Sequence, residues 1–158
     1  MGVLLNAAFV GMSSGLLDKK GRVCIPSSYR QALSAQQNPF VVYLRHALLT
    51  PSLEGFGAQV VQRFLDAQTE SDPFFTAAHD TDAFAALALS QELAIDETGR
   101  VRLPDDFIAY AGLKDGVTFV GLGVKFEIWD SAQFAKVREE RMEAAREQAR
   151  SREQGRKP

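Results

Sequence analysis

Residues 17–26 read Leu-Asp-Lys-Lys-Gly-Arg-Val-Cys-Ile-Pro, and residues 95–104, 78 positions later, read Ile-Asp-Glu-Thr-Gly-Arg-Val-Arg-Leu-Pro. The two stretches share an aspartate, a glycine, an arginine, a valine and a proline: Asp18/Asp96, Gly21/Gly99, Arg22/Arg100, Val23/Val101 and Pro26/Pro104. The same offset, without a gap, also matches Tyr29/Phe107, Val42/Val120, Leu44/Leu122 and Phe56/Phe134. Agreement at this many positions in one register predicts a tandem duplication.

Each stretch is predicted to form the tip of a β-hairpin. In an Asp-x-x-Gly turn the aspartate side chain accepts hydrogen bonds from the backbone, and the glycine tolerates a positive φ. Alternation in the strand that follows predicts that Val23 and Ile25 face inward, whereas Arg22 and Cys24 face outward. The second copy repeats this alternation with Val101 and Leu103 inward and Arg100 and Arg102 outward.

Short helices and further strands are predicted after each proline. Ser27 and Asp105 are the predicted N-caps of helices near residues 28–33 and 106–111, and Gly112 is predicted to end the second helix. The next strands are expected near residues 40–45 and 47–50 in the first copy and near 117–122 and 125–129 in the second. Ser52 is predicted to cap a helix with an apolar stripe of Leu53, Phe56, Val60 and Phe64.

A charged helix is predicted at the C-terminal end of the chain. Asp130 and Gln133 have the spacing of a capping box, and the helix that they begin is expected to fray after about residue 150. An acidic, partly helical segment over residues 66–89 joins the two copies. The fold class is therefore α+β, with modules at residues 12–54 and 90–133 and a helix or tail at 134–158.

Charge is distributed unevenly along the chain. Residues 1–53 hold five cations and one acid, whereas residues 54–99 hold nine acids and one cation, although the net charge of the whole chain is only −2. Such a chain can present a basic face to a nucleic acid despite an acidic average.

The sequence does not indicate an enzyme, a metal site or a cofactor site. Cys24 is the single cysteine, which fits a reducing compartment, and His46 and His79 lack the spacing of metal ligands. No nucleophile stands with an assignable base, so we expect no catalysis, no cofactor and no metal. No apolar run approaches 18 residues, and we expect no membrane span.

The two Asp-x-x-Gly-Arg motifs, together with the residues around them, resemble those of the MraZ family, which consists of tandem SpoVT-AbrB domains. The resemblance extends from about Phe9 to Phe134. It rests on Leu17–Arg22, Pro26 with Tyr29-Arg30, Ile95–Arg100 with Pro104, Ala111-Gly112-Leu113, Val120-Gly121-Leu122 and Phe126–Asp130.

The resemblance implies a swapped-hairpin β-barrel of the AbrB kind, with both halves in one chain and with capping helices. It implies a homo-oligomeric ring that binds short direct repeats of double-stranded DNA upstream of the cell-division and cell-wall gene cluster that contains its own gene, and represses that cluster. The implied location is the cytoplasm and nucleoid. The Asp-x-x-x-Arg element is associated with DNA binding in the family, which here points to Asp18/Arg22 and Asp96/Arg100.

Six cations are the candidate DNA-binding residues. An exposed arginine at a turn can reach a phosphate or a guanine edge, whereas a lysine adds affinity through phosphates without sequence choice. The candidates are Arg22, Arg100, Lys19, Lys20, Arg30 and Arg102. Asp18, Gly21, Asp96 and Gly99 are expected to shape the turns.

Two other functions stay open beside DNA binding. An AbrB-fold antitoxin would use its charged C-terminal tail to bind a small toxin. A structural ring-forming interaction protein would not need the turn arginines at all.

Overall fold

A six-stranded antiparallel sheet and a separate two-stranded ribbon form the β part of the molecule, in the strand orders β1-β7-β8-β4-β3-β5 and β2-β6. The computed structural model describes residues 5–70 and 76–156. Its strands are β1 (Met12–Leu16), β2 (Arg22–Cys24), β3 (Val41–His46), β4 (Leu53–Phe56), β5 (Ser90–Ala94), β6 (Arg100–Arg102), β7 (Gly116–Gly121) and β8 (Phe126–Asp130). The predicted α+β class is confirmed, whereas barrel closure and hairpin exchange stay predictions.

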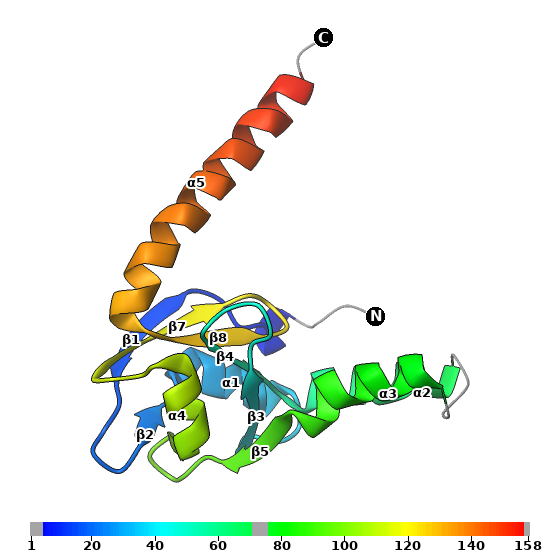
Figure 1. Ribbon diagram of the computed structural model, residues 1–158. Coiled ribbons are helices and arrows are strands. Elements are labelled where there is room, and N and C mark those ends of the chain that lie inside the picture. Colours follow the sequence, from blue (N-terminus) through cyan, green and yellow to red (C-terminus); the bar gives the residue numbers. More distant parts are fainter. Residues whose placement is uncertain (1–4, 71–75, 157–158) are drawn as a thin grey trace.

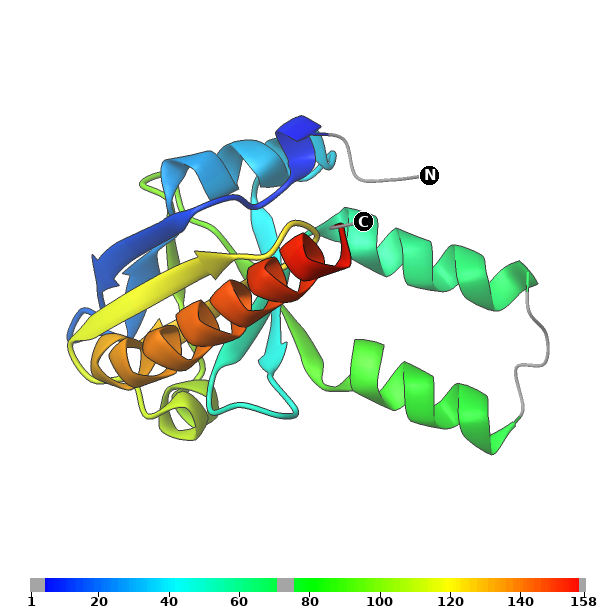
Figure 2. The ribbon, with the colours of Figure 1, turned by 90° about the horizontal axis from the view of Figure 1, so that it is seen from above.

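The helices cover the sheet or project from it. They are η1 (Leu5–Ala7), α1 (Ser27–Ala35), α2 (Ala58–Glu70), α3 (Ala77–Ala83), the π-helix η2 (Phe84–Ala88), α4 (Asp105–Ala111) and α5 (Ser131–Gly155). The long helix α5 leaves the sheet as a rod (Figure 1). Helix α2 and the α3–η2 helix project together from another side as a two-helix arm (Figure 2). The described part of the acidic linker is therefore largely helical, as expected.

The two predicted turns are present, but β2 and β6 pair with each other, and the pairing across the second turn is limited to an isolated bridge between Ile95 and Val101. The Gly21 N–H donates to the Asp18 carbonyl (3.0 Å) and the Asp18 N–H donates to the Arg22 carbonyl (2.9 Å), which closes the first turn. Beyond it β1 pairs with β7, and β2 pairs with β6. The predicted hairpins do not extend into ladders beyond their turns, because pairing β2 with its own copy, β6, buries the valines of both strands in one core.

The helix starts also differ from the prediction. Pro26 (φ −53°) and Pro104 (φ −58°) are the N-caps, without a side-chain cap, and Ser27 and Asp105 are the first helical residues. In place of a side-chain acceptor, the carbonyls of Pro26 and Pro104 accept from the N–H groups of Tyr29 (2.9 Å) and Phe107 (3.0 Å) in the first turn of each helix. Gly112 ends α4 in the left-handed region (φ 59°), as predicted.

Residues 53–56 form a central strand and not the predicted helix, and the predicted strand at 47–50 lies in a loop. Strand β4 pairs with β3 on one side and with β8 on the other. Gly55 makes this pairing possible, because a Cβ there would lie 2.2 Å from the ring of Phe126. The helix begins only at Ala58, and Ser52 does not cap it.

The ungapped 78-residue offset holds through the first helix of each copy and then fails. Strand pairing makes Val42 equivalent to Val117, Leu44 to Phe119 and Phe56 to Trp129. The first copy is longer because α1 has nine residues, whereas α4 has seven, and because its loops after α1 and β3 are longer. The later matches Val42/Val120, Leu44/Leu122 and Phe56/Phe134 were therefore wrong.

One apolar cluster fills the space between the six-stranded sheet, the ribbon and helices α1 and α4. Its largest members include Phe9, Tyr29, Phe119 and Phe126, which contact one another through edge-on or tilted rings. Tyr29 donates its hydroxyl to the Gly11 carbonyl at 2.6 Å, and burial raises its pKa to about 12. The ribbon is thus fixed to the core through Val23, Ile25 and their second-copy counterparts.

Helix α5 is anchored at its first turns and free further on. Asp130 accepts a hydrogen bond from the Gln133 N–H (3.3 Å), which confirms the predicted cap. Phe134 packs with the fully buried Trp129 in a second, smaller cluster on the outer face of the sheet. The helix continues to Gly155, so the fraying expected after residue 150 was wrong.

Candidate nucleic-acid interface

The β2-β6 ribbon gathers three of the six predicted DNA-binding residues on one outward face. Its register sets Arg22 opposite Arg102, Val23 opposite Val101, and Cys24 opposite Arg100. Both valines are buried, whereas Cys24 and Arg102 are exposed and the other two arginines are partly exposed. The predicted alternation is therefore confirmed, and three arginines and one cysteine face outward together.

The arginines lie closer together than sequence distance suggests. The Ile25 N–H donates to the Gly99 carbonyl (2.9 Å) and the Leu103 N–H donates to the Gly21 carbonyl (2.8 Å). Antiparallel ladders alternate, so Arg22 and Arg102 form a non-hydrogen-bonded pair, with Cα atoms about 4.5 Å apart. Like charges directly opposite each other repel, and an anion bound over the ribbon would relieve this repulsion.

Asp18 holds both the first turn and the arginine that follows it. Its Oδ1 accepts from the backbone N–H groups of Lys20 (2.9 Å) and Arg22 (2.8 Å), and its Oδ2 accepts from the Arg22 Nε at 2.7 Å. The Arg22 backbone hydrogen bond is the main cause that lowers the pKa of Asp18. Binding through Nε leaves the terminal edge of the guanidinium for a partner outside the chain.

Asp96 repeats this arrangement around the second turn. Its Oδ1 accepts from the Arg100 N–H (2.9 Å) and from both the N–H (2.9 Å) and the hydroxyl (2.7 Å) of Thr98. The Arg100 backbone, then the Thr98 hydroxyl, lower the pKa of Asp96 to about 2. The ion pair with Arg100 is longer (3.3 Å), and the Arg100 side chain is 39% exposed, compared with 27% for Arg22.

Arg30 lies against the second turn and not on the outward face of the ribbon. Its Nε donates to the Ile25 carbonyl (3.1 Å), and a Cβ on Gly99 would lie 2.7 Å from its Cζ. Gly99 also has a φ of +84°, so both its backbone and its contact with Arg30 require glycine. In the other half of the ribbon Ile108 takes the place of Arg30, beside Gly21.

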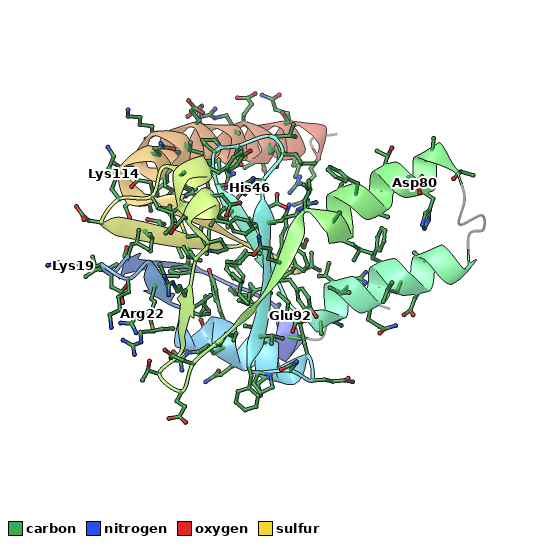
Figure 3. The ribbon with its side chains drawn as sticks, turned by 60° about the horizontal axis from the view of Figure 1, so that its bottom comes forward. Lys19, Arg22, His46, Asp80, Glu92 and Lys114 are labelled. Carbon is green, nitrogen blue, oxygen red and sulfur yellow. The ribbon has the colours of Figure 1, made fainter. Side chains whose placement is uncertain are left out.

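The first turn is the basic one. Figure 3 shows Lys19 and Arg22 projecting outward from one end of the molecule, whereas Asp80 lies on the helical arm at the other end. Lys19 and Lys20 are both exposed, and their counterparts in the second turn are Glu97 and Thr98. The structure therefore places the two lysines next to the Arg22/Arg102 pair.

The outer face of the sheet carries charged residues that the sequence analysis missed. Glu54 and Glu127 lie directly opposite each other on β4 and β8. Glu54 is paired with Arg45 (2.9 Å) and Lys125 (3.1 Å).

Glu127 accepts from the Trp129 Nε1 (3.0 Å) and from Arg141 (2.6 Å and 3.0 Å). Burial acts to raise the pKa of Glu127, but the Arg141 and Trp129 hydrogen bonds outweigh it and the pKa is lowered. The alternation of Glu127 and Trp129 in β8 was the available sequence signal for this anchor of α5.

His46 packs against aromatic side chains. His46 stacks on Tyr110 at a ring-centroid distance of 4.1 Å and lies 3.7 Å from Asp106. Over residues 5–70 and 76–156 no group of three His, Cys, Asp or Glu side chains is placed to hold a metal ion. Within the same residues no helix has the length and apolar character needed to cross a bilayer.

The molecule is an α+β domain that presents arginines on an exposed two-stranded ribbon, and some proteins that recognise nucleic acids use such ribbons. A family model described as "MraZ protein, putative antitoxin-like" matches residues 86–157. The transcriptional regulator MraZ of Gluconobacter oxydans is 37% identical over 152 residues, which cover 95% of this chain and 90% of that protein.

Two further relatives carry the same name. That of Xanthobacter autotrophicus is 40% identical over 122 residues (77% of this chain and 76% of the relative), and that of Azorhizobium caulinodans is 34% identical over 143 residues (90% of each). The chain belongs to the MraZ family, as the motifs indicated.

Proposed function

We propose that the protein is a sequence-specific, double-stranded-DNA-binding transcriptional regulator, located in the cytoplasm and nucleoid, that represses the cell-division and cell-wall gene cluster containing its own gene. The outward face of the β2-β6 ribbon carries this proposal, because it combines three arginines with two adjoining lysines. A two-stranded ribbon fits the major groove of B-DNA, where arginine reads guanine through two hydrogen bonds. The curated relatives named transcriptional regulator MraZ support the same activity.

Some of the candidate residues contact base edges, and others contact the phosphates of the DNA backbone. Arg22 and Arg100, each held at Nε by an aspartate, read base edges. Lys19 and Lys20 contact phosphates, as does Arg30 from below the second turn. Modules 12–54 and 90–133 each supply one turn and one ribbon strand, and the helix at 134–158 stays outside the DNA contact.

A homo-oligomeric ring would supply the affinity that one ribbon lacks. Each ribbon offers few contacts, so several ribbons engaging repeated operator sites would raise the overall affinity through a high effective concentration. A monomeric variant should bind a single repeat weakly and should gain little on a duplex with several repeats. Equal affinity of monomer and assembly for the repeated site would contradict the ring.

Fluorescence anisotropy across a salt series tests the DNA proposal. The full chain, Arg22→Ala, Arg100→Ala and Arg146→Ala are titrated with a duplex from upstream of the gene and with a scrambled duplex. Each ribbon variant should lose ~1–3 kcal/mol of binding free energy on the upstream duplex, or about thirtyfold in affinity at the middle of this range. Arg146 lies on α5 and pairs with Glu143, so its variant is the matched control. The proposal fails if the ribbon variants bind like this control.

An antitoxin function is the second candidate, because α5 presents an exposed helical surface beyond its anchor at Arg141. Removal of residues 142–158 separates the two functions. It should leave DNA affinity unchanged if the ribbon binds DNA, and it should abolish co-purification of a small toxin if the helix is an antitoxin element.

A further inference from the structure

The backbone of the ribbon has a local twofold axis, but the side chains that this axis relates are not all the same. The axis passes through the Val23/Val101 pair and relates each residue of β2 to the residue 78 positions later in β6. It relates Arg22 to Arg100, which are the same residue, and Cys24 to Arg102, which are not. We propose that Arg102 is a specificity-determining residue that makes the DNA site read by the ribbon asymmetric, an inference that rests on the proposed DNA-binding function.

The asymmetry follows from the symmetry of DNA itself. A duplex has local twofold axes that relate its two strands, and a ribbon in the major groove would meet related bases with related side chains. Arg22 and Arg100 would then favour the same base at two related positions. Arg102 would favour guanine at its position, whereas the short thiol of Cys24 is a weak donor that cannot make a bidentate contact.

Arg102 is better placed for such a contact than its position in the sequence suggests. It is exposed, and it has no acidic partner among residues 5–70 and 76–156, whereas Arg22 and Arg100 are each held by an aspartate. It lies in a close pair opposite Arg22, at the end of the ribbon that carries the lysine-containing turn. A guanidinium that is repelled by its neighbour and not neutralised gains most from an acceptor on DNA.

Selection of sites from a random duplex library tests the inference. The full-length wild-type chain, Arg102→Cys and Cys24→Arg are selected in parallel, with Arg22→Ala as a control for a different position. The wild-type motif should contain one pair of related positions with matching bases and one pair with unmatched bases. Arg102→Cys should lose the preference at the unmatched position, and Cys24→Arg should gain the same base at the related position on the other strand, so both motifs become more palindromic.

Competition binding gives the size of the effect. Replacing the guanine that Arg102 is proposed to contact should weaken wild-type binding roughly tenfold, as expected for one bidentate arginine contact. The same replacement should change the affinity of Arg102→Cys less than twofold. Both substitutions lie at exposed positions, and circular dichroism would verify that each variant is folded.

The outcomes separate this inference from the proposed function. Arg102→Cys with an unchanged motif, uniformly weaker binding and a salt slope smaller by about 1 would show a phosphate contact and overturn the inference. An unchanged motif for Cys24→Arg would overturn it as well. Failure of the wild-type chain to select any motif would instead refute the DNA-binding function itself.

Discussion

At the scale of single residues, one carboxylate both shapes a turn and holds an arginine. Asp18 was expected to shape a turn, and Arg22 was expected to contact DNA. The structure joins them, because Oδ1 of the aspartate accepts the backbone hydrogen bonds of the turn while Oδ2 binds the arginine Nε. The turn therefore fixes the orientation of the arginine before any partner arrives.

The low pKa of Asp96 gives this arrangement a titration signature. Thr98→Val removes the hydroxyl hydrogen bond (2.7 Å) and should raise the pKa of Asp96 above its value of about 2. Arg100→Ala keeps the backbone N–H that is the main cause of the lowered pKa, so it should change the pKa less. Carboxyl chemical shifts followed by NMR from pH 5 to pH 1.5 measure both.

The same carboxylate contributes to stability with a defined sign. Its folded-state pKa lies below the unfolded value of about 3.9, so its contribution is complete above about pH 4 and is lost as the pH falls towards 2. Asp96→Asn should therefore lack part of the acid-dependent loss of stability. An Asp96 that titrates near pH 4 in the folded wild-type chain would contradict this account.

The glycine of the second turn is under two constraints that can be separated. Gly99→Ala should be more destabilising than Gly123→Ala, although both residues have a φ near +85°. A Cβ at Gly123 meets nothing within 4 Å and costs only the left-handed backbone, whereas a Cβ at Gly99 displaces the Arg30 guanidinium. Urea unfolding measures both costs, which should be about 1–2 kcal/mol for the control and larger for Gly99→Ala. Equal costs would mean that the Arg30 contact contributes nothing.

At the scale of elements, α5 is held by a short set of contacts on the outer face of the sheet. Arg141 binds the largely buried Glu127 through two hydrogen bonds and lies 5.5 Å from the centre of the Trp129 ring. Further along the helix, the ion pairs of Arg146 and Arg150 are exposed and stay within the helix itself. The orientation of the rod therefore depends on the Arg141 contacts together with the packing of Phe134 on Trp129.

Arg141→Ala should destabilise the protein by roughly 1–3 kcal/mol, because it leaves Glu127 unpaired in a mostly buried position, although the partly exposed arginine limits the loss. Arg146→Ala should cost less than about 0.5 kcal/mol. Trp129 is the single tryptophan, so urea unfolding followed by its fluorescence reports on both stability and the local anchor. Equal stability of the two variants would show that the Glu127 contact is not an anchor.

Local signals in the sequence predicted where strands and helices lie better than they predicted which strands pair. Alternation at Val23 and Val101 and the glycine at 112 were sufficient to predict a strand face and a helix end. Pairing of β2 with β6 joins residues 76 to 80 positions apart, and no local pattern distinguishes it from a hairpin. Leu53 and Phe56 have a helix-compatible spacing, yet their strand is fixed by neighbours on both sides.

The sequence predicted which residues form the candidate site but not how those residues are placed relative to one another. The repeat identified Arg22, Arg100 and Arg102 as outward-facing, and their mutual placement required the strand register. Arg30 illustrates the limit, since only the fold places its guanidinium against the second turn.

At the scale of the whole molecule, charge is separated between two ends. The arginine-bearing ribbon lies at one end, and the arm formed by α2, α3 and η2 carries acidic residues such as Asp80 at the other (Figure 3). The arm should therefore stay away from a DNA duplex bound at the ribbon.

Charge reversals at the two ends should have different effects on DNA binding. Glu97→Lys, beside the ribbon, should raise affinity and steepen the log–log salt dependence by about 1, as expected for one added phosphate contact. Asp80→Lys should change affinity less than about twofold at 0.1 M salt, where charges more than about 10 Å apart are largely screened. Anisotropy titrations measure both, and an equal response would place the arm at the DNA as well.

Alkylation of Cys24 tests the central claim most directly, because this residue is the single cysteine and faces outward between the ribbon arginines. The rate of modification by a small thiol reagent is measured for the free protein, with the upstream duplex, and with a scrambled duplex at the same concentration. Anisotropy on the same samples establishes the fraction bound. The account predicts strong protection by the upstream duplex and little by the scrambled one. Full occupancy by DNA with an unchanged alkylation rate would show that DNA binds elsewhere than on the ribbon.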